Sequence, residues 1–443
     1  ISEMLLQPII PLVVFVACLQ TVQAGAADFN RAKWDKNVPI PYIIDNGFDQ
    51  EKRNTIREAL DSFEANTCLR FKEDSTPVAK LEYRLVSNEN CRGEVGKYED
   101  ENTVLYLRED CIHLTALQHE TMHTIGFHHT QSRDDRDNYV KVPAELDNDN
   151  VDFKKLIRNE KTTDYGIPYE YDSMLHYPFR NGFEPLDRDY FTATPHRRMT
   201  FNDWKLINMH YKCNEACPPE TACQNGGYQH PNDCTKCVCP QFYTGTHCDE
   251  GLNILSVTPE QLSSLNYNWE DQKELVDGFY QSPSRLVKSS EGTRIRITIE
   301  IIQEQFESTP ETVCNQYGVE IADADLTRVG KRFCSTSRNG YSFVSATNTV
   351  GYRAYSLPER MFVVNVTFAV DGSQQSPQPV QTDSPTSNYE QTEQSKPLPA
   401  QIDEGSGAPV ETPPAPDTVE SPTKEISPET PVPESPSDRQ TAE

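Results

Sequence analysis

Apolar residues at helical spacing mark the first regular element that the chain predicts. Between residues 49 and 66, four of them recur every three or four positions and so share one face of a helix: Ile56, Ala59, Leu60 and Phe63. Asp49 stands just before them, where a carboxylate can accept backbone N–H groups that the first turn leaves unpaired. The pattern predicts an amphipathic helix that packs on a sheet.

Strict alternation of apolar and polar residues replaces this spacing between residues 250 and 370. Two runs carry it: Ile295, Ile297, Ile299 and Ile301, and then Phe362, Val364, Val366 and Phe368. Successive side chains of a strand point to opposite faces, so each run predicts a strand with one buried face. Several such strands in one segment predict an all-β domain, either a sandwich or a barrel.

The two ends of the chain depart from globular patterning. Residues 9–19 form an apolar run too short to span a bilayer, and Val22 and Ala24 follow at the small-residue positions of a signal-peptidase site. We therefore predict a signal peptide over residues 1–24 and, with no other long apolar run, export without a membrane anchor. Residues 371–443 hold 14 of the 32 prolines, which predicts a disordered acidic tail, either plainly solvated or O-glycosylated.

Net charge and cysteine content limit the function classes. The 443 residues carry a formal charge of −27, which argues against a nucleic-acid partner. Of the 13 cysteines, Cys18 lies in the predicted signal peptide, and the even number that remains favours disulfide bonds in an exported chain. A zinc knuckle built on Cys234, Cys237 and Cys239 is the rival interpretation, which an oxidising compartment disfavours.

The strongest chemical signal lies between residues 118 and 137. The spacing H-E-x-x-H-x-x-G-x-x-H is filled by His119, Glu120, His123, Gly126 and His129. Residues four apart share one face of a helix, so the first two histidines can reach one ion, and the glycine lets the chain turn to bring in the third. Three neutral imidazoles suit one Zn²⁺ per chain and leave a position open for water, which Glu120 can deprotonate. Histidines packed in a helical core are the alternative.

The residues around and after the third histidine resemble the astacin family of metzincin metalloproteases. Phe127, Arg133 and residues 135–137 (DRD) match the family's signature G-F-x-H-E-x-x-R-x-D-R-D, and residues 173–177 (SMLHY) resemble the S-x-M-H-Y turn that lies beneath its zinc. Further matches, which extend the resemblance over residues 32–214, are Trp34, residues 40–42 (IPY), Asn208, Tyr211 and Cys213.

Two positions depart from the family pattern. Leu175 stands where the turn usually has methionine, with Met174 one residue earlier, and a leucine of similar volume can still form the apolar floor of the site. Thr130 replaces the glutamate that receives the buried amino terminus of the mature enzymes. The chain also has no Gly-Asp pair like the one with which a family pro-segment blocks the metal. Unless a pro-segment is missing from the sequence, we expect activity on export and an amino terminus near the surface.

The resemblance also implies roles for residues beyond the motif. Tyr177 would ligate zinc weakly and then donate a hydrogen bond to the oxyanion, with packing in the turn as the alternative. Arg198 would line the pocket after the scissile bond and favour acidic residues there, unless it is only a solvated side chain. A strand predicted over residues 103–108 would form the sheet edge that pairs with an extended substrate, or only an ordinary edge.

The resemblance further implies the later modules and the disulfide pairing. Residues 215–249 resemble an EGF-like module, and residues 250–370 resemble a CUB module with two cysteines where four are usual. The implied pairs are Cys68–Cys213, Cys91–Cys111, Cys217–Cys234, Cys223–Cys237, Cys239–Cys248 and, from the cysteines left over, Cys314–Cys334. Asn365 begins a glycosylation acceptor, N-V-T, on a predicted surface strand.

Together these features predict an α+β chain that begins with a metzincin-like catalytic domain over residues 25–214. We expect a secreted zinc metalloendopeptidase that acts on extracellular proteins or peptides, with matrix or cuticle proteins as candidate partners of its EGF-like and CUB-like modules. The alternative is a catalytically inert protein that binds matrix through those modules. Because every candidate catalytic residue precedes Cys213, we expect the modules to be separable from the chemistry.

Overall fold

A computed structural model describes most of the chain between residues 27 and 372. The described ranges are 27–28, 32–149, 152–156, 162–180, 182–193, 198–218, 222–272, 275–276, 278–305 and 314–372. The predicted signal peptide and the predicted tail from residue 373 onward lie outside them. No helix in these ranges is long and apolar enough to cross a membrane.

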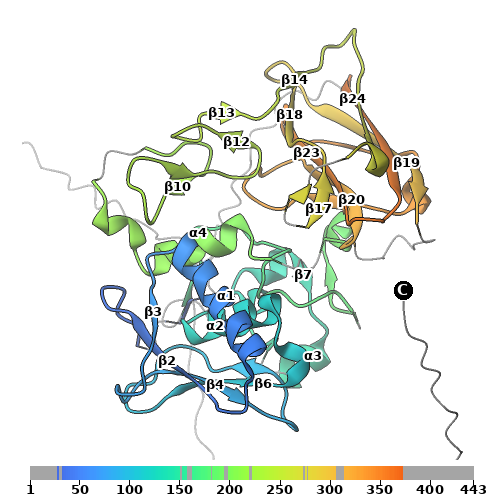
Figure 1. The fold of residues 1–443 in the computed structure, drawn as a ribbon. Helices are drawn as coiled ribbons and strands as arrows, with labels where there is room; N and C mark the ends of the chain where they lie inside the picture. The colour runs from blue at the N-terminus through green and yellow to red at the C-terminus, as the bar shows by residue number, and fades with distance from the viewer. Residues whose placement is uncertain are drawn as a thin grey trace, which may run out of the picture. The chain divides into compact units, whose positions relative to one another are not determined.

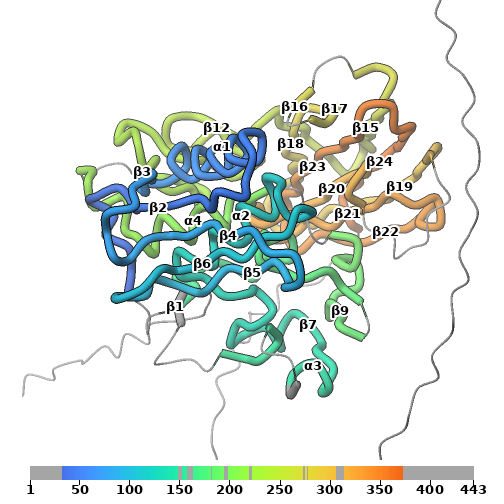
Figure 2. Tube along the Cα trace, turned by 60° about the horizontal axis from the view of Figure 1, so that its bottom comes forward, coloured from blue at the N-terminus to red at the C-terminus, as the bar shows by residue number. Residues whose placement is uncertain are grey.

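Residues 32–214 are built on a five-stranded sheet. Its strands are β2 (Ile40–Ile44), β3 (Phe71–Glu73), β4 (Leu81–Leu85), β5 (Arg92–Gly93) and β6 (Thr103–Leu107). They lie in the order β3-β2-β4-β6-β5 (Figure 2). All are parallel except β5. The strand predicted over residues 103–108 is present as β6, but the prediction that it forms the sheet edge is wrong. β5 covers it, because Arg92 and Gly93 pair antiparallel with Tyr106 and Leu105.

Three α-helices pack with this sheet around one apolar core. They are α1 (Gln50–Asn66), α2 (Leu114–Thr124), which packs on α1 (Figure 1), and α4 (Phe201–His210). The predicted amphipathic helix is confirmed in α1, whose buried residues are the four apolar ones that set the pattern. Asp49 caps it by accepting the Lys52 N–H at 2.9 Å, a contact that contributes about 1 kcal/mol. Short 3₁₀ turns, η1 (Glu109–Cys111) and η5 (Cys213–Ala216), precede α2 and follow α4.

Between α2 and α4 the chain forms short elements around a cluster of aromatic rings. These elements are η2 (Thr130–Ser132), η3 (Arg136–Asn138), β7 (Val140–Lys141), α3 (Ala144–Asp149), β8 (Thr162–Thr163), β9 (Glu184–Pro185) and η4 (Arg188–Tyr190). β7 pairs with β9, and β8 pairs with β1 (Ala27–Asp28). Tyr169, Phe183 and Tyr190 are among the buried rings. Because regular structure is sparse here, ring packing supplies most of the apolar burial.

Residues 217–251 form a small segment rich in cysteine. It contains two antiparallel pairs, β10 (Tyr228–Gln229) with β11 (Cys237–Val238), and β12 (Tyr243–Thr244) with β13 (Glu250–Gly251). Small segments that bury little apolar surface commonly depend on disulfide bonds. Phe242 is fully buried, and it packs on Leu286 and Ala322 of the segment that follows.

Six disulfide bonds connect described residues, in the pairs that the family resemblance implies. They are Cys68–Cys213, Cys91–Cys111, Cys217–Cys234, Cys223–Cys237, Cys239–Cys248 and Cys314–Cys334. The first of them joins residues 145 positions apart, so in chain-entropy terms it restricts the unfolded chain most. The zinc-knuckle interpretation is wrong for this structure, because the sulfur atoms that it needs are all bonded to other cysteines.

Residues 255–370 form a β-sandwich. One sheet contains β14 (Leu255–Ser256), β16 (Leu275–Val276), β17 (Phe279–Gln281), β18 (Arg285–Lys288), β20 (Tyr317–Ala322), β21 (Lys331–Phe333) and β23 (Thr349–Ser356). The other contains β15 (Ser263–Asn268), β19 (Ile295–Glu304), β22 (Tyr341–Val344) and β24 (Phe362–Val370), and the 3₁₀ turns η6 (Trp269–Asp271) and η7 (Thr336–Arg338) lie between strands. Side chains of both sheets share one core.

The two alternating runs are confirmed as strands of this sandwich. The inward residues of β19 and β24 are fully buried, and the two strands pair antiparallel. Asn365 lies at an intervening, half-buried position of β24, where its Nδ2 donates to Glu300 at 3.3 Å. Its glycosylation stays a prediction.

Candidate metal centre

The helix α2 and the turn after it bring three histidines together. His119 and His123 lie four residues apart on α2, which ends at Thr124. Gly126 then adopts φ +105°, a backbone angle that residues with a Cβ resist. The chain turns there, so that the ring of His129 lies 4.6 Å from the ring of His123 and 5.4 Å from that of His119, measured between centroids.

Each of these histidines offers one ring nitrogen to the same small volume. The three nitrogens lie within 4.8 Å of one another, and the Nε2 atoms of His119 and His123 are 3.2 Å apart. Their Nδ1 atoms are 2.8 Å from the carbonyl oxygen of Met174 and 2.7 Å from that of Phe127. Because a carbonyl oxygen can only accept, both Nδ1 atoms donate, and both Nε2 atoms are left with a lone pair for a metal.

The chemistry of this donor set fits a zinc ion. Nε2 of His129 is buried and has no hydrogen-bond partner in the described part of the chain, a costly arrangement unless a metal binds it. Burial lowers the pKa of His123 and of His129 well below 6.5, so both rings are neutral at physiological pH, as ligands must be. Among the described residues, the other group with metal-ligand spacing contains the Cys91–Cys111 disulfide and so offers no thiolate.

Glu120 lies where α2 meets the edge strand of the sheet. Its side chain is buried, and Oε2 accepts the backbone N–H of Gly93 at 2.5 Å. Burial raises the pKa of this carboxyl, which makes it a better proton acceptor near neutral pH. A Cβ at Gly93 would collide with the carbonyl oxygen of Glu120, so this close approach requires glycine. Sequence reasoning missed Gly93, although a glycine within a strand is a known sign of close backbone approach.

Tyr177 lies beside the third histidine. The ring centroids of Tyr177 and His129 are 4.5 Å apart, and the tyrosine hydroxyl donates to Oδ2 of Asp152 at 3.0 Å. The other carboxylate oxygen of Asp152 is 3.6 Å from Nδ1 of His129. Asp152 therefore faces both side chains. No sequence signal singles it out, because it belongs to no motif and to no periodic element.

A network of hydrogen bonds holds the SMLHY turn beneath the histidines. Ser173 donates from Oγ to Oδ1 of Asp203 at 2.7 Å and accepts from the hydroxyl of Thr130 at 2.9 Å. The backbone N–H of Met174 donates to Oδ2 of Asp203 at 2.9 Å. Thr130 thus bonds to the turn at the position where the family pattern has glutamate. Leu175 is buried in the apolar core together with Met174.

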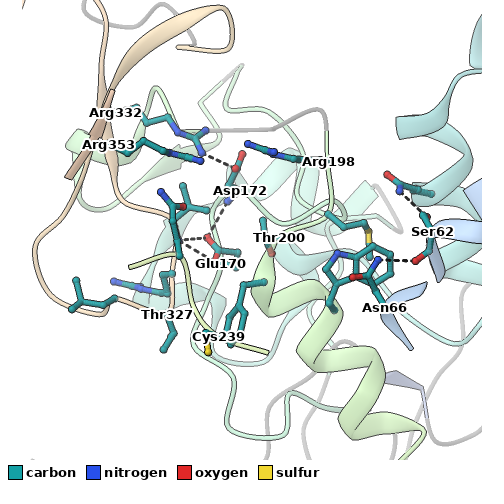
Figure 3. A pocket seen from close by; sticks show the side chains of 18 residues that line it. Ser62, Asn66, Glu170, Asp172, Arg198, Thr200, Cys239, Thr327, Arg332 and Arg353 are labelled. Atoms are coloured by element: carbon teal, nitrogen blue, oxygen red, sulfur yellow. Dashed lines mark hydrogen bonds and ion pairs between the residues drawn. The ribbon is translucent and has the colours of Figure 1, made fainter. Parts of the chain in front are cut away.

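The structure places Arg198 at a cavity, which Figure 3 shows. The cavity measures about 450 Å³ and is lined by several further charged residues: Glu170, Asp172, Arg328, Arg332 and Arg353. None of the three histidines and neither candidate catalytic residue lines it. The role of Arg198 in a substrate pocket therefore stays a prediction, without support from this placement.

Comparison with known proteins relates the chain to zinc peptidases. Residues 26–212 match the family model described as Astacin, a peptidase family. "Zinc metalloproteinase nas-19" of Caenorhabditis elegans is 30% identical over 339 residues, which cover 71% of this chain and 82% of that protein. "Zinc metalloproteinase dpy-31" of Brugia malayi is 30% identical over 339 residues, or 71% of this chain and 55% of that protein. The chain thus spans about half the length of the dpy-31 protein.

A solved structure also matches the chain. It is "High choriolytic enzyme 1 (HCE-1), a hatching enzyme zinc-protease from Oryzias latipes", which is 27% identical. The match covers 41% of this chain and 94% of that one, with a TM-score of 0.35.

Proposed function

Because the chain belongs to the astacin family of peptidases, we propose that it is a secreted zinc metalloendopeptidase that cleaves extracellular proteins or peptides. One observation carries the proposal: three histidine rings offer ring nitrogens to one small volume beside a buried carboxylate. Three protein ligands and an open position are typical of catalytic zinc, whereas structural zinc takes four protein ligands.

In this proposal, His119, His123 and His129 hold one Zn²⁺ per chain. When bound, the ion would act as a Lewis acid that polarises the peptide carbonyl and lowers the pKa of water toward neutrality. The Met174 and Phe127 carbonyls orient two of the rings through hydrogen bonds from Nδ1, as groups behind metal ligands commonly do.

Glu120 would serve as the general base. It would take a proton from the attacking water and then deliver that proton to the leaving amine. The hydrogen bond from Gly93 fixes Oε2 and leaves Oε1 for the transfer. The adjacent β5 is the sheet edge, so its backbone groups could pair with an extended substrate beside this carboxylate.

Tyr177 would stabilise the oxyanion of the transition state. Its hydroxyl donates to Asp152 in the structure, so donation to the substrate requires a rotation of the tyrosine side chain. A donor that acts only on the developing charge raises the rate without tightening substrate binding.

The segments after the catalytic domain would bind other proteins and would not take part in peptide hydrolysis. We propose that residues 215–249 are an EGF-like module and residues 250–370 a CUB-like module, which together contact matrix or cuticle proteins. The six disulfide bonds support export, because such bonds persist in oxidising compartments. Glycosylation at Asn365 belongs to the same proposal.

The alternative is an inert matrix-binding protein. It would keep the disulfide-bonded modules, but it would not explain why Nε2 of His129 is buried without a hydrogen-bond partner in the described ranges. That nitrogen favours the enzyme, because burying a polar atom without a partner costs stability unless a ligand binds it.

The test compares the full chain with Glu120→Gln and with Glu101→Gln, a matched change at an exposed position. Zinc per chain and cleavage of casein are measured for each. We expect zinc in all three proteins and at least ~100-fold slower cleavage for Glu120→Gln alone. Cleavage by Glu120→Gln within about threefold of the parent would refute the general-base role, and a parent that neither holds zinc nor cleaves casein would favour the inert protein.

A further inference from the structure

The turn that orients His119 is held from its other side by the β-sandwich. Asp172 directly precedes this turn, and its Oδ2 accepts a hydrogen bond from Nη2 of Arg332 at 2.8 Å (Figure 3). Arg332 lies on β21 of the sandwich. The two side chains are only 1% and 2% exposed, so water does not screen the pair, and removal of either partner leaves a buried charge.

Arg332 is itself rigidly held. Its Nε donates to Oε2 of Glu320 at 3.2 Å, and its Nη1 donates to the carbonyl oxygen of Ala193 at 2.9 Å. The hydroxyl of Thr192 donates to the backbone oxygen of Arg332 at 2.5 Å. Arg353 donates to the same oxygen of Glu320 at 2.9 Å. With these partners fixed, the guanidinium has little freedom to follow a displaced Asp172.

A second set of contacts holds the same stretch of backbone. The backbone N–H of Val329 donates to both carboxylate oxygens of Glu170, at 3.3 Å to Oε1 and 3.2 Å to Oε2. Glu170 also accepts a hydrogen bond from Nδ2 of Asn202 at 3.1 Å. Asn202, in α4, also donates to the carbonyl oxygen of Thr327 at 3.1 Å. The loop before β21 thus fixes the chain two residues before Asp172.

The same stretch of backbone contacts the metal centre two residues after Asp172. Met174, which receives the Nδ1–H of His119 at 2.8 Å, follows Asp172 by two positions. The backbone N–H of Met174 donates to Asp203, so hydrogen bonds hold both the N–H and the carbonyl oxygen of this residue. A shift of Asp172 would therefore move the carbonyl oxygen that sets the ring orientation of His119.

We propose that Arg332 is a positioning residue for the metal centre: by holding Asp172, it fixes the backbone of residues 172–174 and thus the imidazole of His119. The inference deepens the proposed function and rests on it, because it takes the histidine cluster as the zinc site. It departs from the expectation of fully separable modules, because it gives the β-sandwich a role in the geometry of the metal centre.

The experiment uses the full chain with three substitutions. Arg332→Met removes the charge and keeps the length of the side chain, Arg332→Lys keeps the charge, and Arg296→Met is a control. Arg296 is an arginine of the same sandwich whose partner, Asp371, directly follows β24. The readouts are the visible absorption of Co²⁺ bound at the centre, the Kd for that ion, and kcat and KM for a peptide.

We expect Arg332→Met to shift the Co²⁺ absorption bands, to weaken Co²⁺ binding about tenfold and to lower kcat about tenfold with KM within about threefold. Arg332→Lys should recover part of each change, and Arg296→Met should match the parent. The proposal would be overturned by an Arg332→Met protein with the Co²⁺ absorption bands of the parent and with a Kd and a kcat within about twofold of the parental values.

A second variant keeps the test decisive if Arg332→Met does not fold. The double substitution Asp172→Asn with Arg332→Met removes both charges, so no unpaired charge stays buried. We expect it to fold and still to show the shifted Co²⁺ spectrum, whereas a parental spectrum would overturn the proposal. If the parent binds Co²⁺ but cleaves no peptide, the proposed function fails, while the spectrum and the Kd still decide the role of Arg332.

Discussion

Two clusters of buried polar side chains flank the SMLHY turn, and they are satisfied in different ways. The histidine cluster, His119, His123 and His129, consists of rings that point nitrogen lone pairs at one another and leave one buried nitrogen without a partner among the described residues. The ion-pair cluster, Asp172, Glu320, Arg332 and Arg353, joins two acids to two arginines. The rings of the first cluster offer lone pairs to a ligand, whereas the second cluster pairs its charges within the protein.

This difference separates what each cluster can do. Donor atoms that the protein leaves without partners are stabilised by a metal, so changes there should alter metal binding and chemistry. Charges that neutralise each other fix the geometry of the segments that carry them, so changes there should alter rates, stability and metal affinity by smaller amounts, while all three ligands stay in place.

The largest effect is expected from His123→Ala. Removal of one of three ligands should abolish zinc binding and reduce peptide cleavage at least ~100-fold. His113→Ala is the matched control, because His113 is an exposed residue that caps α2. Metal analysis and a peptide assay check both, and a His123→Ala protein that keeps a full zinc equivalent would show that this ring is not a ligand.

Tyr177→Phe tests the role of the hydroxyl that lies beside the histidine cluster. Loss of the hydroxyl should lower kcat about 100-fold and leave KM nearly unchanged, because an oxyanion donor acts only in the transition state. Asp152→Asn keeps an oxygen that can accept the tyrosine hydroxyl, so we expect it to cost less. Steady-state kinetics on one peptide would contradict the role if Tyr177→Phe raised KM and left kcat unchanged.

Truncation of the chain tests the ion-pair cluster by removing the whole β-sandwich that contributes its arginines. A chain ending at Asn214 lacks Arg332, and we expect it to cleave a short peptide about tenfold more slowly and to melt at a lower temperature. A chain ending at Gly372 keeps the sandwich and should match the full protein. Equal kcat for the two truncated chains would show that the sandwich does not act on the active site.

A buried acid two residues before Asp172 should make the stability of the protein depend on pH. Burial raises the pKa of Glu170 to about 8 from its ordinary value of 4.5, so between these values the folded chain holds a proton that the unfolded chain has lost. Stability should then fall as pH rises through this window, by up to about 1.4 kcal/mol per pH unit. Glu170→Gln should flatten the dependence in urea titrations at pH 5 to 8, and Glu300→Gln, at an exposed position, should not. Parallel curves for the parent and Glu170→Gln would contradict the shift.

What could be read from the sequence is what lies close together along the chain. The helix α1, the strands β19 and β24 and the histidine spacing are set by residues a few positions apart, so periodicity predicts them. The sequence does not indicate the edge strand β5, because two residues, Arg92 and Gly93, are too few to show alternation. Arg332 and Asp172 are 160 positions apart and belong to no motif, so only the tertiary fold reveals their contact.

The most direct test of the account is reversible removal of the metal from the full chain. Zinc is removed with a chelator, and peptide cleavage is followed while Zn²⁺ is added back to the parent and to His123→Ala. We predict that cleavage by the parent is lost with the metal and returns fully at one zinc per chain, whereas the variant stays inactive. Cleavage that persists in the zinc-free parent, or that returns equally in the variant, would contradict the claim that these three histidines form the catalytic centre.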